Sequence, residues 1–206
     1  GTKDRVSYAI RQNKLTFLLT TPLRQDHPIA DHIAKHGDGV KAIALKVEDA
    51  TSDWNETTKR GGKTFLEPTT LRDDGGELVM SGIHTYGDTV HLFIERKNYN
   101  GPFLPSYVKW EPGYETESTG LEYVDHCVGN VGWNQMNPRV KFYEEVMGFR
   151  NILTFDDKDI STEYSPLMSK AMSTGNGFVK FPIHAPAKGK KKHQAEECID
   201  FDARKG

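Results

Sequence analysis

The feature that most constrains the fold is an order of elements that occurs twice along the chain. From Ala42, a strand with alternating apolar residues is followed by a helix and then by further strands, and the same order begins again at Leu121. Two such repeats predict an α+β fold of repeated βαβββ modules, each a curled mixed sheet with its helix behind. Two modules side by side would form a cleft that suits a metal ion and a small ligand.

The individual elements follow from apolar periodicity and from the residues that begin and end helices. Asp49 is expected to cap one helix and Asn137 another, and His91 is expected to lie opposite the apolar side of its strand. The expected strands are 14–20, 42–47, 77–83, 89–95, 121–128, 151–155, 167–173, 177–183 and 197–201, and the expected helices are 27–35, 51–60 and 137–147.

Periodicity fails between residues 98 and 120, where Gly and Pro are frequent, so this stretch is interpreted as a linker or a long covering loop. It divides the chain into one domain at 1–97 and another at 121–206. Both ends look abrupt, because the sequence opens without Met and closes at Gly206 with no terminal helix before it. A trimmed product, a partial gene and a natural short form all remain open.

Composition indicates which kinds of binding partner and which cellular compartment to expect. The formal net charge is −2 at pH 7, which gives no reason to expect nucleic acid or an anionic membrane. The 2 cysteines are too few for a disulfide framework and favour a reducing compartment. No apolar run approaches the roughly 20 residues of a membrane-spanning helix, and the first residues lack the apolar core of a signal peptide. We therefore expect a cytoplasmic protein.

His126 is the strongest single candidate for chemistry. It lies in the apolar segment 121–128, where alternation places it on one face and its neighbours Asp125 and Cys127 on the other. A histidine among apolar residues needs partners for its ring nitrogens. A metal ion is one such partner, and a buried carboxylate or carbonyl is another. One imidazole does not make a metal site, because a non-heme iron centre needs two His and one carboxylate.

Other polar clusters have simpler interpretations. His32 and His36 share a helix face and could bind zinc, although a solvated polar face explains them as well. The basic run 188–192 could attract phosphate, although a solvated loop is the simpler interpretation. The sequence contains no phosphate-binding glycine loop, nucleophile elbow or helical His-Glu zinc motif.

Several long stretches, in a constant order, are similar to one enzyme family. They are KHGDGVKAIALKVED (35–49), HTYGDTVHLFIERKNYNGPFLPSY (84–107), YVDHCVGNV (123–131), KFYEEVMGF (141–149), FDDKDISTEYSPLMS (155–169), KFPI (180–183) and GKKK (189–192). Together they resemble the 4-hydroxyphenylpyruvate dioxygenases over nearly the whole chain. That family belongs to the vicinal-oxygen-chelate group of glyoxalase- and dioxygenase-like folds, whose βαβββ modules agree with the repeat.

The resemblance implies an iron(II) enzyme of tyrosine catabolism that converts 4-hydroxyphenylpyruvate and O2 to homogentisate and CO2. It implies that His126 is the first ligand of Fe(II). The family's other His and Glu ligands belong to a later module, and the matching positions of the earlier half hold Ala42 and Leu92. We therefore expect 1–97 to be a partial, non-catalytic N-terminal domain, 121–206 to be the first half of the catalytic domain, and the isolated chain to be inactive.

The resemblance also implies substrate-binding residues. Ser169 and Gln194 match pocket residues of the family, whereas His184 stands where the family usually has asparagine. No catalytic residue is assigned beyond the metal site. Departures from the family pattern cluster after Ile183 and put the substrate in question more than the fold; they are His184, Ala185, His193, Ala195 and Cys198.

Two alternatives stay open. A hydroxymandelate synthase-like oxygenase shares the substrate and the iron but oxidises the side chain, and a non-catalytic small-molecule-binding protein could keep the same fold. The expected partners are a small 2-keto acid and O2, with neither nucleic acid nor membrane. A homo-oligomer is expected.

Overall fold

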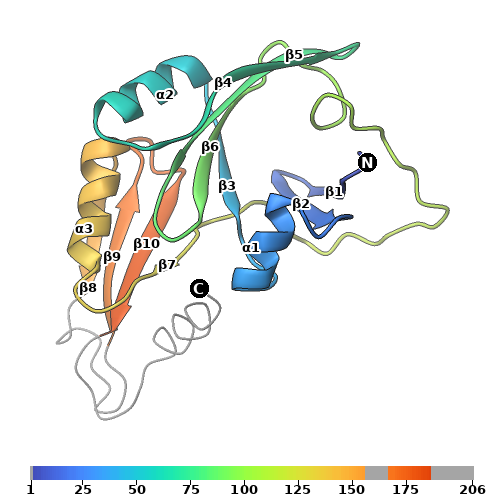
Figure 1. Cartoon of the computed structure of the whole chain (residues 1–206). Coiled ribbons are helices and arrows are strands. Elements are labelled where there is room, and N and C mark those ends of the chain that lie inside the picture. Colours follow the sequence, from blue (N-terminus) through green and yellow to red (C-terminus); the bar gives the residue numbers. More distant parts are fainter. Residues whose placement is uncertain (1, 156–166, 187–206) are drawn as a thin grey trace. The chain divides into compact units, whose positions relative to one another are not determined.

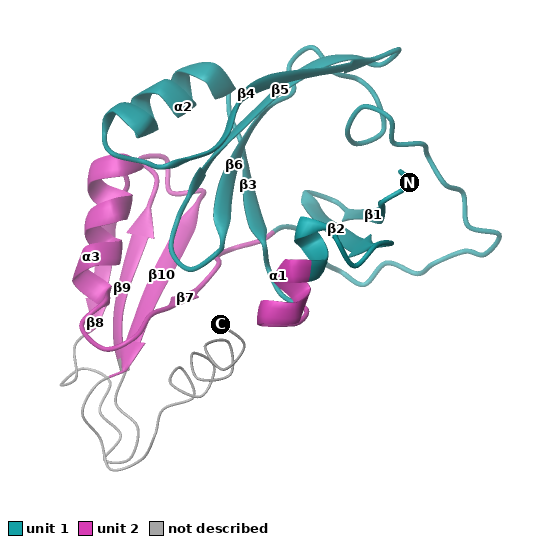
Figure 2. Ribbon diagram, viewed as in Figure 1, with its two compact units in different colours: residues 1–30, 39–123 teal, residues 31–38, 124–206 magenta. Residues whose placement is uncertain are grey.

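The computed structural model describes residues 2–155 and 167–186. The chain divides into two compact units: residues 1–30 with 39–123, and residues 31–38 with 124–206 (Figure 2). Each unit contains one four-stranded sheet, and a separate two-stranded sheet belongs to the first unit. Figure 1 labels the elements.

The four-stranded sheet of the first unit forms one βαβββ module. Its elements are β3 (Ala42–Lys46), α2 (Ala50–Lys59), β4 (Thr64–Asp73), β5 (Gly76–His84) and β6 (Val90–Glu95). The strand order is β3-β6-β5-β4, with β3 parallel to β6 and the other neighbours antiparallel. α2 lies over one face of this sheet (Figure 1).

α2 begins where the sequence predicts it. The Asp49 side chain accepts a hydrogen bond from the Ser52 backbone N–H at 2.8 Å, which satisfies one of the free N–H groups of the first turn. Gly61 follows the helix with a φ of 98°, a conformation that glycine adopts without steric cost. The Ser81 hydroxyl of β5 donates to the Ala50 carbonyl at 2.7 Å and so holds the helix against the sheet.

β6 shows that the expected orientation of His91 is wrong. His91 and Phe93 are both buried, at 1% and 3% exposure. Their side of β6 lies against α2, because the Glu95 side chain on the same side accepts a hydrogen bond from the Ala50 N–H at 3.2 Å. Alternation separates two rows of residues but does not say which row the helix covers.

β4 is not predicted by the sequence. Its pairing with β5 is irregular between Thr64 and Leu66 and again between Leu66 and Thr69, so its apolar residues do not alternate. Pro68 lies in the same stretch, and proline argues against a strand when a sequence is read alone. β4 is an edge strand of the sheet, where bulges and proline are tolerated.

A two-stranded antiparallel hairpin precedes this module, formed by β1 (Arg5–Gln12) and β2 (Leu15–Pro22). Only β2 is predicted by the sequence. Residues 98–123 contain no helix or strand, and residues 118–122 at their end contact the hairpin. The Gln12 side chain donates to the Ser118 hydroxyl at 2.7 Å, and the Lys14 N–H donates to the Glu122 carbonyl at 2.9 Å. The division into domains at 97 and 120 stays a prediction.

The second unit repeats the module. Its elements are β7 (Gly129–Asn130), α3 (Met136–Lys141) continued by the π-helix η1 (Phe142–Val146), β8 (Arg150–Phe155), β9 (Leu167–Ser173) and β10 (Lys180–Pro186). The strand order is β7-β10-β9-β8, again with the first strand parallel to the last and the other neighbours antiparallel. Both sheets thus share one βαβββ topology, which confirms the predicted α+β class.

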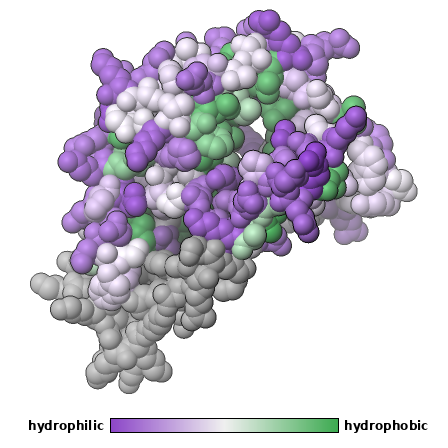
Figure 3. Space-filling view, in the orientation of Figure 1, coloured by the Kyte–Doolittle hydropathy of each residue, from purple (hydrophilic) through white to green (hydrophobic). Residues whose placement is uncertain are grey.

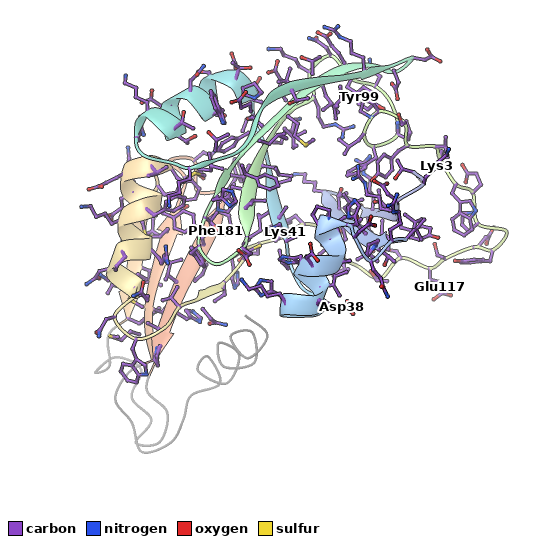
Figure 4. The ribbon with its side chains drawn as sticks, in the orientation of Figure 1. Lys3, Asp38, Lys41, Tyr99, Glu117 and Phe181 are labelled. Atoms are coloured by element: carbon purple, nitrogen blue, oxygen red, sulfur yellow. The ribbon has the colours of Figure 1, made fainter. Side chains whose placement is uncertain are left out.

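Aromatic rings fill the core between the helix and the sheet of the second unit. The Phe181 ring on β10, labelled in Figure 4, stacks on Tyr143 with centroids 5.2 Å apart and on Phe149 at 5.7 Å. Tyr143 and Val140, both on this helix, are buried. The predicted cap at Asn137 is wrong: the helix begins at Met136, and Asn137 instead accepts a hydrogen bond from the Lys170 side chain at 3.0 Å.

The expected strand at 121–128 is also absent. Only Gly129 and Asn130 pair regularly with β10, opposite Ile183 and His184. Before them, the backbone touches β10 at one bond, from the Cys127 N–H to the Lys180 carbonyl at 3.2 Å. β10 begins at Lys180, three residues later than expected, so most of the segment has no strand beside it to pair with.

α1 (Pro28–His36) follows β2; its residues 28–30 are grouped with the first unit and its residues 31–36 with the second. The His27 ring caps it, because its Nδ1 accepts a hydrogen bond from the Ile29 N–H at 3.1 Å. The face seen in Figure 3 is mainly hydrophilic, with hydrophobic residues in separate patches. Among the described residues, every helix is too short or too polar to cross a membrane.

Candidate functional site

Ser169 and His184 lie opposite each other on the sheet of the second unit. They are partners in the antiparallel register of β9 and β10, so their side chains share one face. The adjacent pair, Lys170 and Ile183, belongs to the other face, where the Lys170 side chain reaches Asn137 of α3. Ser169 and His184 therefore occupy the face that α3 does not cover.

This face is partly shielded from solvent. Ser169 is only 7% exposed, and His184 is half-buried. Asn130 of β7 pairs with His184 from the other side, so three polar side chains stand in a row across three strands. A serine hydroxyl, an imidazole and an amide can donate and accept hydrogen bonds, and such a row is able to orient a small polar ligand.

His126 lies in the extended segment before β7, and its side chain is 49% exposed. Its Nδ1 is 2.7 Å from a carboxylate oxygen of Asp125. The other oxygen of Asp125 accepts a hydrogen bond from the Lys180 ammonium at 2.8 Å. The expectation that alternation separates His126 from Asp125 is therefore wrong, because regular strand geometry does not reach residue 126 and the two side chains turn toward each other.

Charge keeps the Asp125 carboxyl ionised. Hydrogen bonds from Lys180 first, and from His126 second, lower the pKa of Asp125 below its ordinary value. The neighbouring Cys127 behaves in the opposite sense, because partial burial raises the pKa of its thiol. Cys127 is thus a protonated thiol at neutral pH.

The four predicted site residues are brought together only in part. Ser169 and His184 are neighbours. His126 is tied through Asp125 to Lys180, which lies four residues before His184 on β10, about 13 Å along a strand. Gln194 lies outside the described residues.

Sequence reasoning did not single out three residues of this surface, namely Asp125, Asn130 and Lys180. Asn130 and Lys180 lie within the quoted family-like stretches 123–131 and 180–183, but neither is apolar or a metal-ligand type. Their relation to the site depends on which residues of β7 and β10 pair. The sequence did offer a signal for Asp125, because it is a carboxylate next to a candidate ligand histidine. Strand alternation placed it on the opposite face, so it was not chosen.

His32 and His36 stack one helical turn apart on α1, with ring centroids 4.6 Å apart. A shared helix face is as predicted. Two imidazoles are half of the four ligands of a structural zinc site, so this pair alone does not define one.

The sequence is similar to several curated enzymes. The 4-hydroxyphenylpyruvate dioxygenase of Aspergillus fumigatus is 40% identical over 98% of this chain and 55% of its own length. Those of Yarrowia lipolytica and Xenopus tropicalis are 39% and 38% identical, each over 98% of this chain. The chain is thus similar to the 4-hydroxyphenylpyruvate dioxygenases over nearly its whole length. It spans about half the length of the curated relatives that it matches. No family model matches the sequence.

Solved structures support the fold. A triple mutant of 4-hydroxymandelate synthase from Streptomyces coelicolor superposes with a TM-score of 0.73 at 21% identity, over 90% of this chain and 52% of that one. A fusion of a xylose isomerase-like TIM barrel with a 4-hydroxyphenylpyruvate dioxygenase superposes with a TM-score of 0.63 at 15% identity, over 90% of this chain and 27% of that one. At these identities the likeness concerns the fold alone, and it agrees with the repeated βαβββ modules.

Proposed function

We propose that this chain is part of an iron(II)-dependent dioxygenase of tyrosine catabolism. The proposed reaction converts 4-hydroxyphenylpyruvate and O2 to homogentisate and CO2. The observation that carries the proposal is 40% identity to a 4-hydroxyphenylpyruvate dioxygenase over 98% of the chain. A cytoplasmic location and a homo-oligomeric state belong to the same proposal.

His126 is proposed as one ligand of the iron. An imidazole is a ligand that non-heme iron(II) accepts, and the ring has one nitrogen bonded to Asp125 and the other directed elsewhere. Such a site needs a second imidazole and a carboxylate, which we propose lie in the part of the relatives that this chain does not span. Bound iron(II) would supply chelation of the 2-keto acid and activation of O2.

Ser169 and His184 are proposed to bind the organic substrate. Both side chains stand on the sheet face left open by α3, and Ser169 is almost fully buried there. A buried hydroxyl makes a stronger and more selective hydrogen bond than an exposed one, because water competes less. These residues would orient the aromatic 2-keto acid and exclude water around it. Gln194 is proposed to take part as well.

A hydroxymandelate synthase-like oxygenase is the second candidate, because a 4-hydroxymandelate synthase has the same fold. That enzyme class would use the same keto acid and iron but would oxidise the side chain and leave the ring unchanged. A non-catalytic protein of this fold would bind the keto acid without turnover. The three candidates therefore differ in product: homogentisate, 4-hydroxymandelate or none.

The test uses the protein that carries this chain, expressed from its whole reading frame. With Fe(II), O2 and 4-hydroxyphenylpyruvate, we expect oxygen uptake, CO2 and homogentisate identified by chromatography and mass. His126→Ala should lose bound iron and activity, whereas His84→Ala, a change at an exposed histidine of β5, should retain both. Full activity and iron content in His126→Ala would overturn the proposal, and 4-hydroxymandelate as the product would favour the second candidate.

A further inference from the structure

A chain of three side chains links the proposed iron ligand to the sheet. The Lys180 ammonium donates to one oxygen of Asp125 at 2.8 Å, and the other oxygen lies 2.7 Å from Nδ1 of His126. Both distances are typical of charge-assisted hydrogen bonds. The carboxylate is therefore bound on both sides, and its rotation is restrained.

The far end of this chain is anchored in the rigid part of the second unit. Lys180 is the first residue of β10, which pairs with β9 on one edge and β7 on the other. Its neighbour Phe181 is 3% exposed in the aromatic core. A backbone bond from Cys127 N–H to the Lys180 carbonyl, 3.2 Å long, holds the histidine segment at the same place. The side-chain contact and the backbone contact thus tether residues 125–127 to one point of β10.

The chemistry of a carboxylate decides which ring nitrogen carries the hydrogen. An ionised Asp can only accept hydrogen bonds, so the nitrogen that faces Asp125 must carry the N–H. In a neutral imidazole the other nitrogen, Nε2, then holds the lone pair that binds a metal ion. In metal sites, carboxylates that take the second N–H of a ligand histidine hold its tautomer and its ring orientation.

We propose that Asp125 and Lys180 are positioning residues for His126. Asp125 holds the ring with its hydrogen at Nδ1 and presents Nε2 to the metal, and Lys180 holds Asp125. The inference rests on the proposed function, in which His126 is an iron ligand. Asp125 contacts the ligand histidine, and Lys180 contacts Asp125.

The pair is expected to act on orientation and not on stability. The side chains of Asp125 and Lys180 are 54% and 34% exposed, and ion pairs at such positions stabilise a fold by little. Loss of Asp125 should therefore leave the unit folded while it changes the histidine tautomer. A changed tautomer in a chain that stays folded would distinguish a positioning role from a structural one.

The first experiment reads the tautomer of His126 directly, without any metal. The whole 206-residue chain is labelled with 15N at histidine, and its ring nitrogens are observed by long-range 1H–15N NMR. The spectrum is taken at about pH 9, well above the ordinary pKa of histidine. The His126 signals are assigned by their loss in His126→Gln. We expect the hydrogen at Nδ1 in the unmodified chain.

The variants then test the two positioning residues. Asp125→Asn should move the His126 population toward Nε2–H, whereas Asp125→Glu should restore part of the Nδ1–H form. Lys180→Met should shift the His126 tautomer in the same direction as Asp125→Asn but to a smaller extent. Lys180→Arg keeps the positive charge and should leave the Nδ1–H form predominant. Glu122→Gln removes an exposed carboxylate nearby in sequence and should change nothing. A His126 that carries its hydrogen at Nε2 in the unmodified chain, or one that does not respond to Asp125→Asn, would overturn the inference.

A second readout uses the protein expressed from its whole reading frame. Asp125→Asn should weaken equilibrium binding of iron(II) by about 10-fold to 100-fold, as is usual when a group behind a ligand histidine is lost. Unchanged affinity would show that the tautomer is not used for metal binding and would also overturn the inference. The proposed function fails separately, if His126→Ala keeps its iron and its activity.

Discussion

Ser169 of β9 faces His184 of β10 as its direct antiparallel partner, on the side of the sheet away from α3. The two residues are 15 positions apart in sequence, and the turn between residues 174 and 179 brings them together. This turn is longer than the three-residue turn that the sequence suggests. It is closed by bonds from the Thr174 N–H to the Val179 carbonyl at 3.1 Å and from the Gly177 N–H to the Thr174 carbonyl at 2.9 Å.

The Ser169–His184 pair predicts an effect on substrate binding. In the protein expressed from its whole reading frame, Ser169→Ala and His184→Ala should each raise KM for 4-hydroxyphenylpyruvate by about 2-fold to 10-fold, the usual value of one hydrogen bond. The double variant should show non-additive loss, because the residues touch one ligand. Thr51→Ala, on an exposed position of α2, is the control and should leave KM unchanged. Additive or absent effects would contradict a shared substrate site.

The isolated 206-residue chain should not catalyse the reaction. One imidazole does not hold iron(II) in a defined site, because affinity depends on the assembled set of ligands. Oxygen uptake with iron(II) and 4-hydroxyphenylpyruvate should equal that of the blank without protein. Turnover to homogentisate by a preparation shown to be free of longer enzyme would contradict this expectation.

His91 should make the first unit less stable in acid. Burial lowers its pKa from 6.5 to about 4, so the folded chain keeps the ring neutral while the unfolded chain protonates it. Between these values the unfolded state binds more protons, and the free energy of unfolding should fall as the pH falls, by on the order of 3 kcal/mol in all. Above pH 6.5 this contribution is constant.

Urea unfolding at a series of pH values, followed by circular dichroism, measures this dependence. His91→Gln should be less stable at neutral pH but should lose most of the slope between about pH 6.5 and pH 4. His84→Ala, at an exposed histidine, should keep the slope of the unmodified chain. An unchanged slope in His91→Gln would assign the acid sensitivity to other groups.

Phe181 should matter far more for stability than Phe178, although both lie at the same end of the hairpin. Phe181 is 3% exposed and stacks on Tyr143 and Phe149, whereas Phe178 is 81% exposed. Phe181→Ala should cost about 3–5 kcal/mol of unfolding free energy in the second unit. Phe178→Ala should change it by less than about 0.5 kcal/mol. Similar losses in both variants would contradict a core built on the stacking of Phe181 with Tyr143 and Phe149.

Local sequence signals were sufficient for the elements whose boundaries depend on local chemistry. Asp49 begins α2 because its carboxylate needs only the N–H of Ser52, three residues away. The stripe that includes Val140 and Tyr143 is buried because it follows the helical period. The repeated order of elements was enough to predict two βαβββ modules, since each crossover helix must lie between parallel strands.

Contacts between distant segments were beyond the reach of periodicity. The sequence did not predict β4, because bulges and Pro68 break the alternation of its residues. Residues 121–128 do not form the predicted strand, because β10 begins too late to pair with most of them. His91 is buried because α2 happens to cover its side of β6, which alternation cannot specify. Likewise, Asp125 contacts His126 because the backbone there is not a regular strand. It contacts Lys180 because β10, 55 positions later in sequence, lies beside it. Helix caps and apolar periodicity depend on residues that are close in sequence. Strand register and helix placement are decided when distant segments pack together, and these determine where the residues of the site lie.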